Sequence, residues 1–180
     1  MRKCPIQEIA KRAGEAGIPF LIIGGYAVIA HGYVRTTNDL DLIIERGRRS
    51  ASGKVLADLG MSVINDAANF SQFESQNRST MDVDLMFVSE EVFSQLERAA
   101  VQRSVDGVPV RVVSLLHLIA LKCHTIRSQV SGLRGIKDTD DLVHLILLNG
   151  LDLNNPELRA IILKHGTEKL YEDLRRTCSE

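Results

Sequence analysis

The sequence has 180 residues, of which 44% are hydrophobic and 25% are charged, as expected for a globular protein of one domain or of one domain with two lobes. Lysine plus arginine (22) nearly equals aspartate plus glutamate (23), and the net charge of -1 excludes a surface that binds polyanions as a whole. Any phosphate site must therefore be local. The three cysteines, Cys4, Cys123 and Cys178, lie far apart without paired metal-ligand spacing, which argues against a disulfide framework or a zinc site.

The N-terminal segment is charged and amphipathic, unlike a signal peptide. No apolar run approaches the roughly 20 residues that a membrane span needs. We therefore expect a cytoplasmic protein with reduced thiols and no membrane partner.

Hydrophobic periodicity predicts the elements of the first part of the chain. Apolar residues at helical spacing predict a helix over 5–16, and a wholly apolar strand over 20–23 leads through Gly24-Gly25 into a short helix over 26–31. The further expected elements are strands over 39–44, 61–64, 70–74 and 80–89, helices over 54–59 (after a basic loop at 45–53) and 90–96, and a hairpin of 101–105 with 108–112.

The remaining residues have helical periodicity only. They predict helices over 115–128, 138–148, 156–165 and 168–176. The chain thus divides into a mixed α/β domain over 1–113 and a helical lobe over 114–180. We expect the helical lobe to pack against the acid-bearing face of the first domain and to leave a cleft.

Two predicted strands carry acids. Asp39 and Asp41 project from the same strand face, and Asp82 and Asp84 do the same on the later strand. Like charges this close repel one another, so the arrangement suits a divalent cation that stabilises both carboxylates as anions. Oxygen ligands favour Mg²⁺ or Mn²⁺. Alternation cannot choose the third ligand, and we predict Asp84 because apolar residues follow it deeper in the strand.

Gly24 and Gly25 stand where a strand turns into a helix. Glycines let the backbone approach a ligand closely, and the exposed N–H groups at a helix start favour a phosphate. Each pattern alone is common in plain turns and solvated strand edges. In this order along the chain, metal-holding acids beside a phosphate cradle predict phosphoryl or nucleotidyl transfer.

The segment GGYAVIAHGYVRTTNDLDLII, residues 24–44, resembles the signature of the DNA polymerase β-like nucleotidyltransferase superfamily. The Arg-x-Thr before the acids and the later KDTDDLVHL, residues 137–145, are similar to the minimal nucleotidyltransferases and the AbiEii-type toxins. The resemblance implies an α/β (α+β) fold, with a nucleotidyltransferase-type mixed sheet, flanking helices and a C-terminal helical lobe. The chain is shorter than typical AbiEii-type toxins, and Tyr26 stands where many superfamily members have serine.

The resemblance also implies roles for particular residues. Asp39, Asp41 and Asp84 would be the catalytic, metal-binding acids, with Mg²⁺ or Mn²⁺ as cofactor. The residues expected to bind the nucleotide are Gly24, Gly25, Arg35, Thr36, Lys122, Lys137 and Asp138, with Asp138 orienting one of the two lysines.

Several functions fit this site. The leading expectation is a metal-dependent enzyme that transfers a nucleoside monophosphate from a nucleoside triphosphate, such as ATP, to a hydroxyl of RNA, a protein or a small molecule. It could serve as the toxin of a toxin–antitoxin system, with an antitoxin protein as partner. The alternatives are a catalytically silent binding or regulatory subunit of the same fold and an antibiotic nucleotidyltransferase.

Other residues have plainer interpretations. Seven basic residues and one acid lie between Arg98 and Lys137, either as a solvated face or as a cationic wall for triphosphate or RNA. Lys122 lies on a largely apolar helix and could be catalytic or structural. His117 and His124 are seven residues apart and are expected to pack or face solvent rather than bind metal.

We expect Cys123 to be a small buried side chain. Asp140 is explained by a helix start, where acids interact favourably with the helix dipole.

Overall fold

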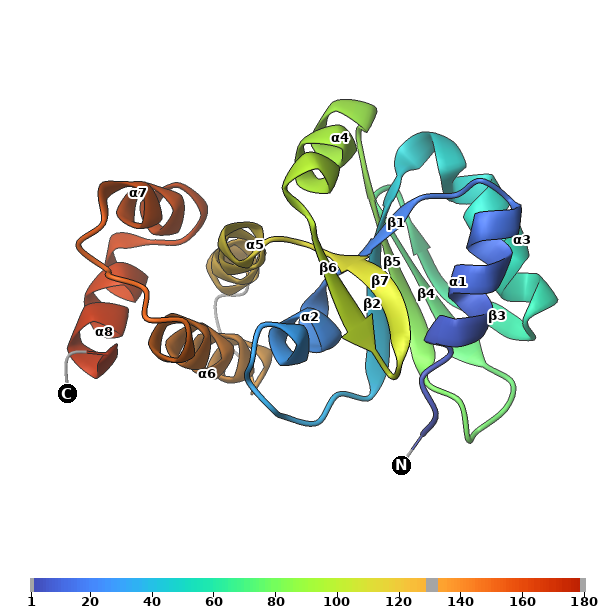
Figure 1. The fold of residues 1–180 in the computed structure, drawn as a ribbon, viewed down its shortest axis with the longest axis horizontal. Coiled ribbons are helices and arrows are strands. Elements are labelled where there is room, and N and C mark those ends of the chain that lie inside the picture. The colour runs from blue at the N-terminus through green and yellow to red at the C-terminus, as the bar shows by residue number, and fades with distance from the viewer. Residues whose placement is uncertain (1, 129–132, 179–180) are drawn as a thin grey trace. The chain divides into compact units, whose positions relative to one another are not determined.

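A computed structural model describes residues 2–128 and 133–178 and divides the chain into two compact units (Figure 1). The first unit comprises residues 1–30 and 35–113, and the second comprises residues 31–34 and 114–180. The short segment His31–Val34 therefore belongs with the helical unit, although it lies between two elements of the sheet-containing unit. The predicted α/β fold with a mixed sheet is confirmed.

The first unit is built on one seven-stranded sheet in the order β3-β4-β5-β2-β1-β7-β6. Its strands are β1 (Phe20–Ile22), β2 (Asp39–Glu45), β3 (Met61–Ala67), β4 (Phe70–Ser75), β5 (Asp82–Val88), β6 (Val101–Val105) and β7 (Val108–Val112). The pairs β2–β5 and β1–β7 are parallel, and the other pairs are antiparallel. The two acid-bearing strands are thus central neighbours that run in the same direction.

Helices cover both faces of this sheet. They are α1 (Ile6–Glu15), α2 (Gly24–Ala30), α3 (Arg49–Asp58) and α4 (Glu90–Ala99), and α1 and α3 lie on the face opposite α2 and α4 (Figure 1). Leu42 and Ile44 of β2 and Leu85 of β5 line a small cavity together with residues of α1 and α3. Because side chains alternate along a strand, Asp41 and Asp84 point to the face that α2 covers.

The β6–β7 hairpin follows the sequence prediction. Asp106 and Gly107 both have positive φ angles, 48° and 82°, as a two-residue type I′ turn requires. Glycine adopts this conformation without strain, and aspartate tolerates it better than most residues.

The second unit contains α5 (Leu115–Ser128), α6 (Leu133–Leu148), α7 (Pro156–His165) and α8 (Glu168–Cys178). Its core includes Ile119, Cys123, Leu142, Ile146 and Ile162, which are all nearly inaccessible to solvent. The expectation of a buried Cys123 is confirmed, burial raises the pKa of its thiol to about 12, and all three cysteines are free. No helix among the described residues is both long enough and apolar enough to cross a membrane.

Two predicted helix starts are wrong. Helix α3 begins at Arg49 rather than near residue 54, after a short 3₁₀ turn at Arg46–Arg48. This stretch has few apolar residues, and its first residue, Arg49, donates to the carbonyls of Ala67 and Ala68. Periodicity cannot detect such contacts because they come from another part of the chain.

Helix α6 begins at Leu133 rather than at residue 138. The acids from Asp138 onward therefore lie in the second and third turns, and the helix-start explanation of Asp140 is wrong. Asp138 and Asp141 are buried instead, at 5% and 0% exposure.

Candidate active site

Three carboxylates meet at the centre of the sheet. In the β2–β5 register Asp39 lies opposite Asp82, and Asp41 lies opposite Asp84. One carboxylate oxygen from each of Asp39, Asp41 and Asp84 lies within 4.8 Å of the others. Asp84 is buried, whereas Asp39 and Asp41 are half-buried, so the group opens toward solvent on one side. Among the residues that the structure describes, this is the one group of three such side chains close enough to hold a metal ion.

Asp82 has other contacts. Its Oδ2 forms an ion pair with Arg2 Nη1 at 2.5 Å, and its Oδ1 accepts a hydrogen bond from the Ser75 backbone N–H at 3.1 Å. The carboxylate is thus directed toward β4 and the N-terminal segment. The geometry favours Asp84 as the third acid, as the sequence predicted.

Gly24 lies directly against Asp41. A Cβ atom at this position would come within 3.0 Å of Oδ2, Cγ and Cβ of Asp41, and Gly24 has a φ of +57°. Both the close approach and the left-handed backbone require glycine. The Ile23 N–H also donates to the Asp41 carbonyl at 3.0 Å, which fixes the start of α2 beside the acid-bearing strand.

The second glycine packs on the segment that precedes the acids. A Cβ at Gly25 would lie 2.7 Å from Thr37 Cβ, so the chain passes close to the first turn of α2. The Thr37 hydroxyl donates to Asp39 Oδ1 at 2.9 Å. Arg35 is half-buried, with its Nη1 on the carbonyl of the exposed Thr36 at 2.9 Å. The structure thus brings Gly24, Gly25, Arg35, Thr36 and the three acids into one region of the first unit.

Tyr26 does not replace the serine of other superfamily members. Its side chain is buried, with 7% exposure, and its hydroxyl donates to the Met81 sulfur at 3.4 Å. Burial raises the pKa of this phenol well above its ordinary value. Tyr26 is therefore a packing residue of α2.

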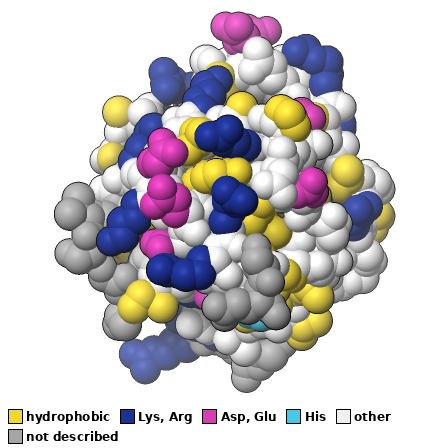
Figure 2. Space-filling view, turned by 90° about the vertical axis from the view of Figure 1, so that its left-hand side faces the viewer, with side chains coloured by type: hydrophobic (Ala, Val, Ile, Leu, Met, Phe, Trp, Pro, Cys, Tyr) yellow, Lys and Arg dark blue, Asp and Glu magenta, His cyan; other side chains and the backbone are white. Residues whose placement is uncertain are grey.

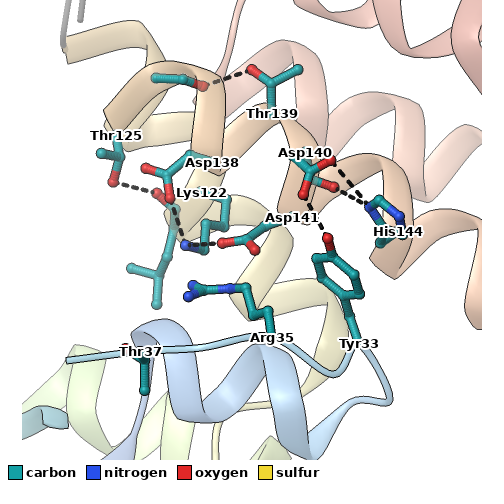
Figure 3. A network of polar contacts seen from close by, with 12 residues as sticks. Tyr33, Arg35, Thr37, Lys122, Thr125, Asp138, Thr139, Asp140, Asp141 and His144 are labelled. Carbon is teal, nitrogen blue, oxygen red and sulfur yellow. Dashed lines mark hydrogen bonds and ion pairs between the residues drawn. The ribbon is translucent and has the colours of Figure 1, made fainter. Parts of the chain in front are cut away.

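Lys122 is buried between two carboxylates of the helical unit (Figure 3). Its Nζ lies 2.5 Å from Asp138 Oδ1 and 2.7 Å from Asp141 Oδ2. The side chain does not reach solvent as an ordinary surface lysine would. Asp138 holds Lys122, as expected of one of the two lysines, and Asp141 holds it as well.

Lys137 is exposed on α6. The basic run from Arg98 to Lys137 is divided between the two units. Arg98, Arg103 and Arg111 belong to the first unit, and Lys122, Arg127 and Lys137 belong to the second. Arg111 Nη1 forms an ion pair with Glu97 at 3.2 Å, and residues 129–132 of the run lie outside the described residues.

His117 and His124 of α5 contact other side chains, in the packed and solvent-facing environments that the sequence predicted. Ser114 Oγ and His117 Nδ1 are 2.8 Å apart, and burial lowers the pKa of His117. His124 is exposed, beside Arg127.

Two residues of the site regions were missed from the sequence. Thr37 contacts Asp39, whereas its neighbour Thr36, the predicted phosphate contact, is exposed. Asp141 is held to Lys122 one helical turn after Asp138. The three-residue spacing of these aspartates, which places both on one helix face, was the signal for Asp141.

The comparisons with known proteins agree with this geometry. The sequence profile of a family described as a nucleotidyl transferase of unknown function (DUF2204) matches residues 3–173. The chain belongs to this nucleotidyl transferase family. The predicted relationship to the DNA polymerase β-like nucleotidyltransferases is confirmed. None of the proteins with curated functions matches the sequence.

Solved structures share the fold of this nucleotidyl transferase along most of its length. The antibiotic-resistance factor ANT(2″)-Ia has a TM-score of 0.68 at 19% identity, over 95% of this chain and 93% of that chain. An antigenic nucleotidyltransferase-like protein from Paracoccidioides brasiliensis has a TM-score of 0.57 at 16% identity, over 96% and 93% of the two chains. The lincosamide antibiotic adenylyltransferase LnuA has a TM-score of 0.55 at 11% identity, over 78% and 95%.

Proposed function

We propose that the protein transfers a nucleoside monophosphate from a nucleoside triphosphate to a hydroxyl acceptor, with divalent metal held by Asp39, Asp41 and Asp84. The observation that carries the proposal is the group of three carboxylates within 4.8 Å on adjacent parallel strands, beside the start of α2. Membership of a nucleotidyl transferase family supports the type of reaction.

The donor set fits Mg²⁺ or Mn²⁺. It contains only carboxylate oxygens, and three negative charges this close favour a hard divalent cation. When bound, the metal supplies charge neutralisation for the triphosphate and activation of the attacking hydroxyl.

Residues of this chain would position the substrate. Gly24 and Gly25 let the start of α2 pack against Asp41 and Thr37, so that its backbone N–H groups would lie beside the acids to contact the triphosphate, and the Thr37 hydroxyl orients the Asp39 carboxylate. Arg35 and Thr36 are candidates to contact phosphate oxygens. This arrangement would hold the α-phosphate near the acids while the diphosphate leaves.

In the helical unit, we assign nucleotide contact to Lys137 rather than to Lys122. The Lys122 ammonium is already held by two buried carboxylates, whereas Lys137 is exposed. Lys137→Glu should raise the KM for the triphosphate several-fold without lowering the melting temperature, and an unchanged KM would remove Lys137 from the site.

For the acceptor, we favour the hydroxyl of a small molecule. ANT(2″)-Ia, which has been solved with adenylyl-2″-tobramycin, covers nearly the whole chain and is itself almost fully covered. The face that includes α7 and α8 carries acidic, basic and apolar side chains side by side (Figure 2), which does not favour a polyanion on that face. RNA and protein acceptors, a toxin role and an antitoxin partner remain predictions from the sequence.

The decisive experiment is a transfer assay with each of the four labelled nucleoside triphosphates and Mg²⁺ or Mn²⁺. Aminoglycosides and lincosamides, tRNA and total protein serve as separate acceptors, and Asp84→Asn serves as the inactive control. Label on an antibiotic supports the small-molecule proposal, whereas label only on tRNA or protein overturns that choice of acceptor. A folded protein that binds triphosphate but labels nothing would be the silent binding subunit.

A further inference from the structure

The segment between α2 and β2 is anchored to the helical unit. It follows the two glycines and precedes Asp39, and residues His31–Val34 within it group with α5 to α8 rather than with the sheet. The chain therefore leaves the first unit after Ala30 and returns to it at Arg35. Gly24 and Gly25, the candidate phosphate contacts, precede residues 31–34 in the chain, and Asp39, a candidate metal ligand, follows them.

One aromatic ring provides most of the anchor (Figure 3). The Tyr33 hydroxyl donates to Asp140 Oδ2 at 2.7 Å, and the Tyr33 ring stacks on His144 with centroids 3.8 Å apart and an interplanar angle of 3°. His144 Nδ1 lies 2.9 Å from the Asp140 carbonyl oxygen. Asp140 and His144 are one helical turn apart on α6, so together they contact the edge and the face of the same ring.

A second contact holds the beginning of the segment. Asn149 Nδ2, at the end of α6, donates to the His31 carbonyl at 3.1 Å and to the Leu145 carbonyl at 2.9 Å. The segment is thus attached to α6 at two places, about two turns of helix apart.

From this anchor the chain reaches the first acid within a few residues. Val34 to Asn38 separate Tyr33 from Asp39, and near the end of this stretch Thr37 packs at Gly25 and donates to Asp39 Oδ1. Holding Tyr33 on α6 leaves only these few residues of the segment free to move, and a short stretch of chain has few conformations.

We propose that Tyr33, Asp140 and His144 are positioning residues that hold the loop at residues 35–38 and, through Thr37, the Asp39 carboxylate. The inference rests on the proposed function for its catalytic consequence. It gives α6 a positioning role in the reaction that is separate from the nucleotide contact proposed for Lys137 of the same helix. Because misplacement of a catalytic group by about 1 Å can cost about 10²-fold in rate, loss of the anchor should reduce kcat more than it changes KM.

The test compares Tyr33→Ala, which removes the hydrogen bond and the stack, with Tyr33→Phe, which removes only the hydrogen bond. We expect kcat to fall by about 10-fold or more in Tyr33→Ala, with the KM for triphosphate within about threefold of wild type, and a smaller fall in Tyr33→Phe. Asp140→Asn, which keeps an acceptor oxygen, should retain more activity than Asp140→Ala.

Tyr171→Phe is the matched control. Tyr171 is a buried tyrosine of the same unit, and its hydroxyl donates to the Leu153 carbonyl at 2.9 Å. This variant should lower stability without lowering kcat. Hydrogen exchange over residues 31–38 should accelerate in Tyr33→Ala and stay unchanged in Tyr171→Phe.

Unchanged exchange over residues 31–38 in Tyr33→Ala overturns the anchor itself, and faster exchange with kcat within twofold of wild type overturns its positioning role. If the wild-type protein transfers no nucleotide, the proposed function fails separately. Mn²⁺ titration then decides the inference: Tyr33→Ala should bind Mn²⁺ several-fold more weakly than Tyr171→Phe, and equal binding overturns it.

Discussion

Replacing Asp41 by asparagine separates a metal site from a structural ion pair. The carboxylate oxygens of the three acids lie within 4.8 Å of one another. At this distance one pair of like charges costs about 1 kcal/mol in a water-like medium and about 3 kcal/mol at an effective dielectric constant of ~20. Asp41→Asn keeps the shape and removes this repulsion, so without metal the free energy of unfolding should stay unchanged or rise by about 1–2 kcal/mol.

With metal bound, the wild-type protein should become more stable than Asp41→Asn. A saturating ion at about 100 times its Kd adds about 2.7 kcal/mol to the stability of the protein that binds it. For a chain of this length, 1 kcal/mol corresponds to about 2–4 °C in melting temperature. Thermal denaturation with and without Mn²⁺ should thus show a rise of several degrees for wild type and little or none for Asp41→Asn. Nucleotide transfer by the variant should collapse.

Asp82→Asn is the matched control, because this acid lies on the same strand face but pairs with Arg2. Both partners are partly exposed, so the loss should cost no more than about 1 kcal/mol, and the Mn²⁺ shift should persist. A loss on the order of 3 kcal/mol in metal-free Asp41→Asn, with transfer intact, would falsify the metal-site assignment, since it indicates a positive partner left buried.

Three further predictions follow from particular contacts. Gly24→Ala should lower the free energy of unfolding by about 1–2 kcal/mol because of the left-handed φ at this position, and it should abolish nucleotide transfer by displacing Asp41. Gly14→Ala, in open space on α1, should stabilise the protein slightly in the same melting assay. Lys122→Met should lower the free energy of unfolding, measured in urea, by about 3–5 kcal/mol because two buried carboxylates lose their cation. Adding Asp138→Asn and Asp141→Asn should recover part of this loss, and a loss below about 1 kcal/mol in Lys122→Met would contradict the buried ion pair. Burial lowers the pKa of His117 below its ordinary 6.5, so the unfolded chain takes up the proton first and the stability falls as pH drops through 6.5. In His117→Gln the melting temperature should fall less steeply over this pH range, and an unchanged pH profile would contradict a contribution of His117.

The sequence determined the elements whose periodicity is strong. Alternation in DLDLII and MDVDLMFV predicted both acid-bearing strands, and the Gly-Gly after an apolar run predicted helix α2, which begins at Gly24, two residues before the expected start. These signals are local, because side-chain direction repeats every two residues in a strand and every 3.6 in a helix. The start of α3 was mispredicted because its first residue, Arg49, contacts the carbonyls of Ala67 and Ala68, which periodicity cannot detect. Helix α6 begins five residues before the predicted start at residue 138.

Only the tertiary structure decided which polar groups meet. Asp82 and Asp84 are equivalent in the alternation, and the pairing of Asp82 with Arg2, 80 residues away, distinguishes them. Lys122 could have faced solvent, but the packing of α5 against α6 places it between Asp138 and Asp141. The contact of Tyr33 with Asp140 joins residues 107 positions apart. Such contacts depend on how strands and helices pack, which local residue patterns do not specify.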